Sequence, residues 1–433
     1  MKDELNMEKR NFMEKYFPQG HYISWIILII TTLSMLMTSV SRQILPTVLP
    51  AIMQEYSLTP AEVGTISSFL YIGICIGSII FGVYSDYSGK GYKRSKPWVY
   101  TVIITAIGGI AVAYSRMLLA MKCFLGILGI GTGGSEPINV AIVGEYWSKE
   151  HRGFAVGFHH IGFPLGQFAG PLIIGFVLTI ATWHEAFIFV PLLAIPLAVM
   201  QLIFGSKKNQ AKVFEWIQQK KLSLPYNKNE FNEQPSLKET LLNMKYCLKN
   251  HNCVYAIATF FGFLYVEVGI ATFLTLQLTD AGIALAVAAI ISGASGITGW
   301  IGQIAWGTIS DHLGRKFSLK IITIGFFIAV LACIFINSEI TGWVILIGWG
   351  LFRNSPYPVT YAILLDSLPK GASSALGIMV GAGWFISAIA GPVEGYIIQT
   401  YGFTYHYLFL GIITLFTLFL ITRLRETVTI NSK

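Results

Sequence analysis

A short set of ionisable side chains lies inside apolar stretches of this sequence that are long enough to cross a membrane. They are Arg42, Lys122, Glu136, His159, His160, Glu267, Arg353 and Glu394. A charged group that faces lipid costs roughly 3 kcal/mol or more. Each of these side chains is therefore expected to face a partner or a water-filled cavity, and together they indicate a polar path through the membrane.

The composition around these residues is that of a membrane protein. Of 433 residues, 54% are hydrophobic and 12% are charged, whereas about 25% are charged in soluble domains. A helix needs roughly 20 apolar residues to cross about 30 Å of hydrocarbon. On this criterion the sequence predicts twelve membrane-spanning helices, at approximately 22–52, 61–85, 97–115, 118–147, 153–178, 186–205, 252–279, 285–310, 317–337, 341–366, 373–400 and 404–422.

The twelve spans predict an all-α integral membrane protein with two pseudo-symmetric six-helix bundles, over residues 22–205 and 252–422. The segment between them, 206–251, is polar and rich in lysine. It has too few apolar residues to bury a core of its own, so it is interpreted as a cytoplasmic linker with short surface helices. Residues 1–21 and 423–433 are expected to lie outside the bundles as cytoplasmic segments.

The formal net charge of +8 indicates orientation rather than nucleic-acid binding. Lysine and arginine gather in alternate loops, which the positive-inside rule assigns to the cytoplasm together with both termini. The chain is therefore expected in a plasma membrane, such as a bacterial inner membrane. The basic residues in these loops are Lys90, Lys93, Arg94, Lys96, Lys149, Arg152, Arg315, Lys316 and Lys370, and Arg116 is an exception on the opposite side.

Patterns typical of enzymes and ATP-driven pumps do not occur in the sequence. It contains no HExxH, P-loop, GxSxG or CxxC pattern, so neither class is indicated. The five cysteines show no paired or metal-ligand spacing and are interpreted as small apolar packing residues. No cofactor, metal or nucleic-acid partner is expected.

One sequence pattern occurs once in each half, between the second and third spans. The chain reads "GVYSDYSGKGYKRSK" from Gly82 and "GTISDHLGRKFSLK" from Gly307. This repeated G-x-x-x-D-x-x-G-[RK] pattern resembles the major facilitator superfamily. The resemblance implies a secondary transporter that works by rocker-switch alternating access, functions as a monomer, and has its first, fourth, seventh and tenth spans around a central cavity.

Charged residues near the repeated pattern are candidates for gating. Its glycines can let neighbouring helices approach closely, and its acidic and basic residues can pair at helix ends. The resemblance implies salt bridges at this end that break when the two bundles rock; ordinary helix-end charge is the alternative. The candidates are Asp86, Lys90, Arg94, Glu145, Arg152, Asp311, Arg315 and Asp366.

Glycines and prolines also recur in the fifth and eleventh spans, in "GFHHIGFPLGQFAGPLIIG" and "GWFISAIAGPVEG". They are expected to permit close packing between helices. A similar motif is common in antiporters and also present in symporters, so it leaves the direction of transport open.

Arg42 and Arg353 are the candidates for substrate binding, on helices from opposite halves. A guanidinium binds a carboxylate through two parallel hydrogen bonds, so the two arginines could hold a small organic anion. Asn354, Tyr357 and Tyr361 add hydrogen-bonding groups near Arg353. The alternatives are a buried ion pair for Arg353 and a side chain extended towards the interface for Arg42.

Glu136 is the first candidate for proton coupling, because a carboxylate in a dry site can take up and release a proton during a transport cycle. Glu267 is the second, with a salt bridge to a cavity arginine as its alternative. Lys122 and His160 are further coupling candidates, against packing roles, and Glu394 is expected to pair structurally.

The first half also resembles the organic anion:cation symporter group, in "SRQILPTVLPAI", "YSLTPAEVGTISSFLYIGICIGSIIFG" and "SEP". That group usually has Asp-Arg where this chain has Ser41 and Arg42, so the proton site is expected to fall on Glu136. The hypothesis is proton-coupled symport of a small organic anion. Export of drugs or metabolites, and uptake of an amino acid, sugar or nucleoside, remain alternatives.

Overall fold

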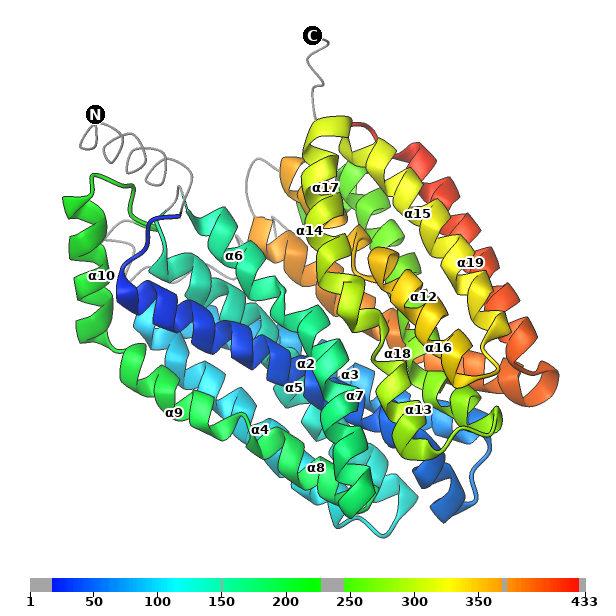
Figure 1. Ribbon diagram of the computed structural model, residues 1–433. Coiled ribbons are helices and arrows are strands. Elements are labelled where there is room, and N and C mark those ends of the chain that lie inside the picture. The colour runs from blue at the N-terminus through cyan, green and yellow to red at the C-terminus, as the bar shows by residue number, and fades with distance from the viewer. Residues whose placement is uncertain (1–17, 149–150, 227–244, 368–371, 428–433) are drawn as a thin grey trace, which may run out of the picture.

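The computed structural model describes residues 18–148, 151–226, 245–367 and 372–427. Within these ranges the chain forms helices and no strand (Figure 1). Residues 1–17, 227–244 and 428–433, which belong to the predicted terminal segments and linker, lie outside the described residues.

The first half contains six spans, and the last two are each divided into two helices. The helices are α2 (Tyr22–Tyr56), α3 (Pro60–Ser88), α4 (Ser95–Ala113), α5 (Leu118–Tyr146), α6 (Arg152–His160) with α7 (Gly162–Ile180), and α8 (Trp183–Leu192) with α9 (Ile195–Phe204). A short 3-10 helix, η1 (Gly91–Arg94), lies between α3 and α4.

The second half also contains six spans, of which the second and the fourth are each divided into two helices. Its helices are α12 (His251–Asp280), α13 (Leu285–Ser292) with α14 (Ser295–Leu313), α15 (Arg315–Ala332), α16 (Glu339–Arg353) with α17 (Pro356–Asp366), α18 (Ala372–Tyr401) and α19 (Phe403–Arg423). The twelve predicted spans agree with these helices to within a few residues at each end, which confirms the predicted fold class.

The tenth span is interrupted beside Arg353. Within the described residues, eleven helical stretches are long and apolar enough to cross a membrane. Neither α16, with 15 residues, nor α17, with 11, is among them. The division falls at Asn354 and Ser355, directly before Pro356. Proline has no N–H to donate and disfavours helical geometry in the preceding residue, which accounts for the break.

Glycines on α5 let this helix approach its neighbours at backbone distance. A Cβ atom at Gly129 or Gly133 would lie 2.2 Å from a carbonyl oxygen of α3, and one at Gly131 would lie 2.2 Å from the Thr105 hydroxyl of α4. The run "GIGTGGSEP" therefore serves helix packing, and it positions Glu136 at the end of a closely packed segment.

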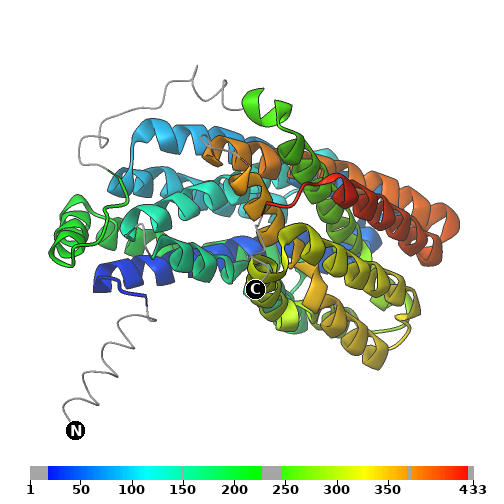
Figure 2. The ribbon, with the colours of Figure 1, turned by 90° about the horizontal axis from the view of Figure 1, so that it is seen from above.

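The two halves form neighbouring groups of helices, from blue to green and from green to red in Figures 1 and 2. They contact each other mainly through α3 with α18, α7 with α13 and α14, and α2 with α12. Several of the closest approaches lie at the end opposite the basic loops. There a Cβ atom at Gly64 would lie 2.1 Å from the Gly391 carbonyl oxygen.

Several glycines of the fifth and eleventh spans make the close contacts predicted for them, whereas a Cβ atom at Gly157 would meet nothing within 4 Å among the described residues. A Cβ atom at Gly166 would lie 2.5 Å from the Leu36 carbonyl oxygen on α2, and one at Gly395 would lie 2.3 Å from the Pro60 carbonyl oxygen. The prediction was wrong for the glycines that open the repeated pattern. A Cβ atom at Gly82 would meet nothing within 4 Å, and one at Gly307 would meet only Pro358, at 4.0 Å. Among the described residues at this end of the molecule, no helix packs closely against either glycine.

The first described part of the linker, residues 206–226, packs against the first half. Helix α10 (Lys207–Gln219) buries Val213, Phe214 and Ile217 in the core of that half. Gln210 accepts a hydrogen bond from the Tyr92 backbone N–H at 2.9 Å. Both views show α10 at the outer edge of the first half, away from the second (Figures 1 and 2). The linker therefore supports the basic loop between α3 and α4.

Gly64 and Gly82 lie on the same helix and provide a test of the packing between the halves. We expect Gly64→Ala to destabilise the protein by about 1–3 kcal/mol, because the added methyl group overlaps backbone atoms of Gly391. Gly82→Ala is the control, and its unfolding temperature should equal or exceed that of the wild type, since alanine favours helix. Thermal unfolding of the purified variants measures both, and equal stability would contradict this account of the interface.

Candidate functional site

A central cavity of about 80 Å³ lies between the two halves, with room for a few water molecules or part of a small solute. Its lining comes from α2, α3, α5, α6, α7, α12, α14, α16, α17 and α18. Most of the predicted binding and coupling residues meet here: Arg42, Glu136, His160, Glu267, Arg353, Asn354, Tyr357 and Tyr361.

Arg42 on α2 forms an ion pair with Glu136 on α5. The Arg42 Nη1 atom lies 3.1 Å from Glu136 Oε2, and Nη2 donates to the Thr132 carbonyl oxygen at 2.9 Å. The Arg42 side chain is 5% exposed and that of Glu136 is 14% exposed. The buried Nε atom of Arg42 has no hydrogen-bond partner among the described residues. This arginine therefore has one donor without a protein partner in the described part of the chain, and a ligand could reach it only after the side chain moves, because the atom is covered in this arrangement.

Arg353 at the end of α16 forms an ion pair with Glu267 on α12. Arg353 Nε lies 2.9 Å from Glu267 Oε1, and Nη1 donates to Ser295 Oγ at 2.7 Å. The Tyr357 hydroxyl donates to the other carboxylate oxygen of Glu267. The two halves thus carry matching ion pairs with the signs exchanged. In the first half the basic residue is on the first span and the acidic residue on the fourth. In the second half the acidic residue is on the seventh span and the basic residue on the tenth.

These pairs change the interpretation of the two arginines. The sequence predicted that both would turn to one ligand, but each arginine bonds an acid of its own half. The alternatives raised for Arg353 and Glu267, a buried ion pair and a salt bridge to a cavity arginine, describe the observed contacts. Both pairs nevertheless line the cavity, so either is within reach of a bound solute.

Aromatic rings cover the cavity beside Arg42. The Arg42 guanidinium lies 4.8 Å from the centre of the Trp384 ring on α18. Tyr71 on α3 stacks on Trp384 with the ring centres 5.7 Å apart and the planes at 12°. This wall was not predicted, because an aromatic residue in a membrane span gives no sign in the sequence of whether it faces lipid or a cavity.

Gln167 on α7 is a second unpredicted residue of the site. Its side chain is 2% exposed. Its amide nitrogen donates to Glu267 Oε1 at 2.8 Å, and its amide oxygen accepts from Asn354 Nδ2 at 2.8 Å. Both partners belong to the other half. The signal available in the sequence was the position of this polar residue, between Gly166 and Gly170 in an otherwise apolar span.

Three ionisable residues of the spans do not line the cavity. Lys122 lies near the start of α5 and donates to Thr65 Oγ1 at 2.7 Å; about 14 residues of helix, or roughly 20 Å, separate it from Glu136. Glu394 lies 2.7 Å from His406 Nδ1 in a buried pair between α18 and α19. His159 is fully buried against its neighbours, and of the two adjacent histidines only His160 lines the cavity.

Candidate gating residues of the first half form one cluster at the basic end. Arg94 Nη2 lies 2.9 Å from Glu145 Oε1, and the same carboxylate accepts the Gly91 backbone N–H at 2.5 Å. Arg94 also donates to Ser85 Oγ at 2.8 Å. Lys90 lies with its amine 5.3 Å from the Tyr226 ring centre of the linker. Through these contacts Glu145 connects the loop between α3 and α4 to the C-terminal end of α5.

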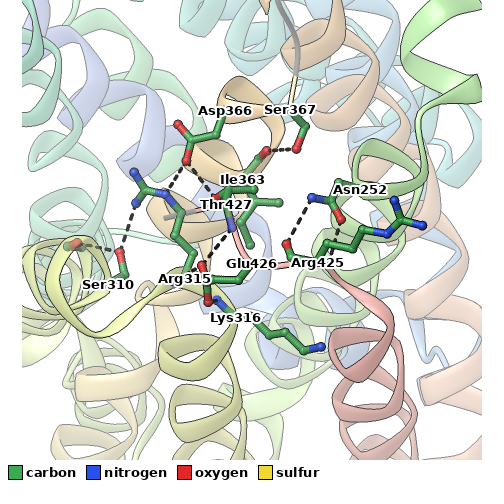
Figure 3. Close-up of polar contacts among 11 residues, drawn as sticks. Asn252, Ser310, Arg315, Lys316, Ile363, Asp366, Ser367, Arg425, Glu426 and Thr427 are labelled. Carbon is green, nitrogen blue, oxygen red and sulfur yellow. Dashed lines mark hydrogen bonds and ion pairs between the residues drawn. The ribbon is translucent and has the colours of Figure 1, made fainter. Parts of the chain in front are cut away.

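The second half builds the same cluster with two acids (Figure 3). Arg315 Nε lies 2.7 Å from Asp366 Oδ2, and Arg315 Nη1 donates to Ser310 Oγ at 3.3 Å. The loop N–H groups of Arg315 and Lys316 donate instead to Glu426, which follows α19, at 2.8 and 3.0 Å. Asp366 takes the place of Glu145 as the partner of the arginine, and its side chain is one methylene shorter. The hydrogen bonds from the loop backbone, which Glu145 accepts in the first half, are accepted here by Glu426.

Each of these pairs joins elements of a single half. The side chains of Asp86, Arg152 and Asp311, three further gating candidates, lie outside the described residues.

Curated proteins with similar sequences are named as transporters. The chain is 26% identical over 88% of its length to a putative metabolite transport protein of Haemophilus influenzae, of which it covers 92%. It is 24% identical over 46% of its length to the benzoate transport protein of Acinetobacter baylyi and covers 42% of that protein. With the niacin transporter of the same organism, the identity is 28% over 39% of the chain and 37% of the relative.

Solved structures share the fold. The xylose transporter XylE of E. coli, in a partially occluded inward-open conformation, superposes with a TM-score of 0.70 at 15% identity. The alignment covers 94% of this chain and 99% of that one. The sequence profile described as Major Facilitator Superfamily matches residues 31–352 and 255–432. The chain therefore belongs to the major facilitator superfamily of membrane transporters.

Proposed function

We propose that this transporter carries a small aromatic carboxylate across the membrane together with a proton, by alternating access. The observation that carries the proposal is the Arg42–Glu136 pair beside the Trp384 ring. It combines an anion-binding group with a free donor, an acid that competes for that group, and an aromatic surface. The names of similar proteins, which include benzoate and gallate transporters, agree with this substrate class.

The charges of the cavity explain why a proton should accompany the anion. Arg42 and Arg353 are balanced by Glu136 and Glu267, so the residues that line the cavity carry no formal net charge. A carboxylate entering this cavity would bring an unbalanced negative charge into a site of low dielectric, which is unfavourable. Protonation of Glu136 removes one negative charge and releases Arg42, so the loaded cavity is neutral again.

Glu136 fits the role of proton carrier better than Glu267 does. Protonation of Glu136 breaks a single ion pair among the described residues. Glu267 accepts hydrogen bonds from Arg353, Gln167 and Tyr357, so its protonation would disturb three contacts. His160 lines the cavity within electrostatic range of Glu136 and offers a route for the proton. Lys122 lies too far from Glu136 to exchange a proton with it directly.

The aromatic wall supports a ring-containing substrate. A carboxylate bound at the free donor of Arg42 would place its ring against Trp384, on which Tyr71 is stacked. Offset stacking of aromatic rings contributes about 0.5–1.5 kcal/mol beyond burial. Arg353, Asn354, Tyr357 and Tyr361 would face the other side of the substrate. The neutral cavity offers no surplus of negative charge for a lipophilic cation, the substrate of the exporter alternative.

We further propose that the basic loops face the cytoplasm of a bacterial inner membrane. The support is the distribution of lysine and arginine and the bacterial origin of the similar proteins. The cavity lies between the two halves of one chain, which supports the proposal that the protein functions as a monomer.

Proton coupling can be tested with radiolabelled benzoate in proteoliposomes. We expect the wild type to accumulate benzoate when the outside is more acidic than the inside. Glu136→Gln should lose this accumulation but retain exchange of benzoate for benzoate, because the neutral amide imitates the protonated acid. Arg42→Ala should raise the KM of exchange at least about tenfold, the effect of losing a charged hydrogen bond worth about 1.4 kcal/mol or more.

Glu394→Gln is the matched control for this experiment, since Glu394 is buried but does not line the cavity. Uptake that ignores the pH gradient in the wild type, and that neither Arg42→Ala nor Arg353→Ala changes, would refute the proposal.

The substrate class can be tested by changing the aromatic wall. We expect Trp384→Leu to raise the inhibition constant of benzoate by about 2–10-fold, the equivalent of 0.5–1.5 kcal/mol of stacking. Inhibition by cyclohexanecarboxylate, which has no aromatic face, should change less. Trp306→Leu, on α14 and outside the cavity lining, serves as the control. Equal changes for the two acids would indicate that the wall contributes only apolar surface.

A further inference from the structure

The two halves are joined across the cavity by a chain of hydrogen bonds that the proposed proton and substrate sites do not require. Asn354 Nδ2 donates to Gln167 Oε1, and Gln167 Nε2 donates to Glu267 Oε1, each at 2.8 Å. Gln167 belongs to α7 of the first half, while Asn354 and Glu267 belong to the second. All three residues are buried, with at most 4% of the surface of each residue exposed.

The direction of this chain depends on the charge of Glu267. A carboxylate accepts hydrogen bonds and donates none, so it fixes the amide nitrogen of Gln167 towards itself. The amide oxygen then faces the nitrogen of Asn354. If the Gln167 amide were reversed, its oxygen would meet the carboxylate and its nitrogen would meet another nitrogen. The ionised form of Glu267 therefore orients both hydrogen bonds of Gln167, which together we call the bridge.

The bridge ends at the interruption of the tenth span. Asn354 caps the C-terminal end of α16, and α17 begins two residues later at Pro356. A Cβ atom at Gly299 of α14 would lie 2.8 Å from Asn354 Nδ2 and 3.4 Å from Pro164 Cβ of the first half. The absence of a side chain at Gly299 leaves room for Asn354 to reach Gln167. A rotation of one half relative to the other must break these hydrogen bonds or move both segments together.

The titratable groups that face Glu267 come from several helices. They are Arg353 on α16, Tyr357 and Tyr361 on α17, and Tyr71 on α3. Arg353 supplies the opposite charge and the tyrosines are neutral donors, so this setting suits an ionised carboxylate in the arrangement seen here.

We propose that Gln167 is a positioning residue that holds the two halves in this arrangement while Glu267 is ionised, and that loss of the charge on Glu267 releases it. Its role in transport rests on the proposed function, because alternation between the halves is the step that it would govern. In this scheme Glu136 binds the proton that accompanies the substrate. The hydrogen bonds of Gln167 depend instead on the charge of Glu267, which belongs to the second ion pair.

The test is hydrogen–deuterium exchange of the purified full-length protein, without substrate or gradient. The reporters are the backbone amides of residues 172–180 in α7 and of α13, which pack together at the end opposite the basic loops. We expect Gln167→Leu to increase their exchange rates at least about threefold, because the loss of hydrogen bonds to a charged group favours separation of the halves. Glu267→Gln should produce the same increase, and the double variant should add nothing further.

Gln201→Leu is the matched control. Gln201 is also a fully buried glutamine, but it donates to Ser95 Oγ within the first half, at 3.1 Å. This variant should leave the exchange of the reporter segments at the wild-type rate. If Gln167→Leu fails to fold, Asn354→Ala removes one of the two hydrogen bonds and should give a smaller increase in the same segments.

Two results would overturn the proposal: exchange in Gln167→Leu equal to that in Gln201→Leu, or additive effects of Gln167→Leu and Glu267→Gln. Benzoate uptake by the wild type, measured in parallel, separates this proposal from the proposed function. Absence of uptake with the predicted exchange pattern would reject the substrate and retain the bridge.

Discussion

Every buried charge near the centre of this membrane protein must have a partner, and this constraint organises the site. Arg42 pairs with Glu136, and Arg353 pairs with Glu267. Removal of either member would leave an uncompensated charge in a medium of low dielectric. The pairs are confined to single halves, so each half is electrically balanced when the halves move relative to one another.

The two pairs differ in how completely they are bonded, and the tasks that we propose for them follow from this difference. The carboxylate of Glu267 is surrounded by donors, including one from the opposite half. The Arg42–Glu136 pair keeps an unbonded donor and a more exposed acid. A pair with spare hydrogen-bonding capacity can exchange partners with a ligand, whereas a saturated pair is better suited to maintaining a structure.

Close backbone contacts let the helices bring these residues together. The glycines of α5 pack this helix closely against α3 and α4, and its Glu136 pairs with Arg42 of α2. The break before Pro356 places Asn354 against the other half. The clusters around Arg94 and Arg315 show that the two halves achieve the same set of contacts with different residues. In the first half, Glu145 pairs with Arg94 and also accepts the loop N–H of Gly91. In the second half, Asp366 pairs with Arg315, and Glu426 accepts the loop N–H groups.

The sequence by itself determined the twelve spans, the all-helical fold, the family and the small set of buried ionisable residues, because hydropathy and the cost of buried charge act locally along the chain. It could not identify the partners of those residues. Arg42 and Glu136 are 94 residues apart, and Arg353 and Glu267 are 86 apart. Only the tertiary structure decided that each arginine binds an acid of its own half, that Lys122 lies away from the cavity, and that Gln167, Tyr71 and Trp384 face it. The physical reason is that helix rotation and packing depend on contacts between distant segments, which set the direction in which each side chain points.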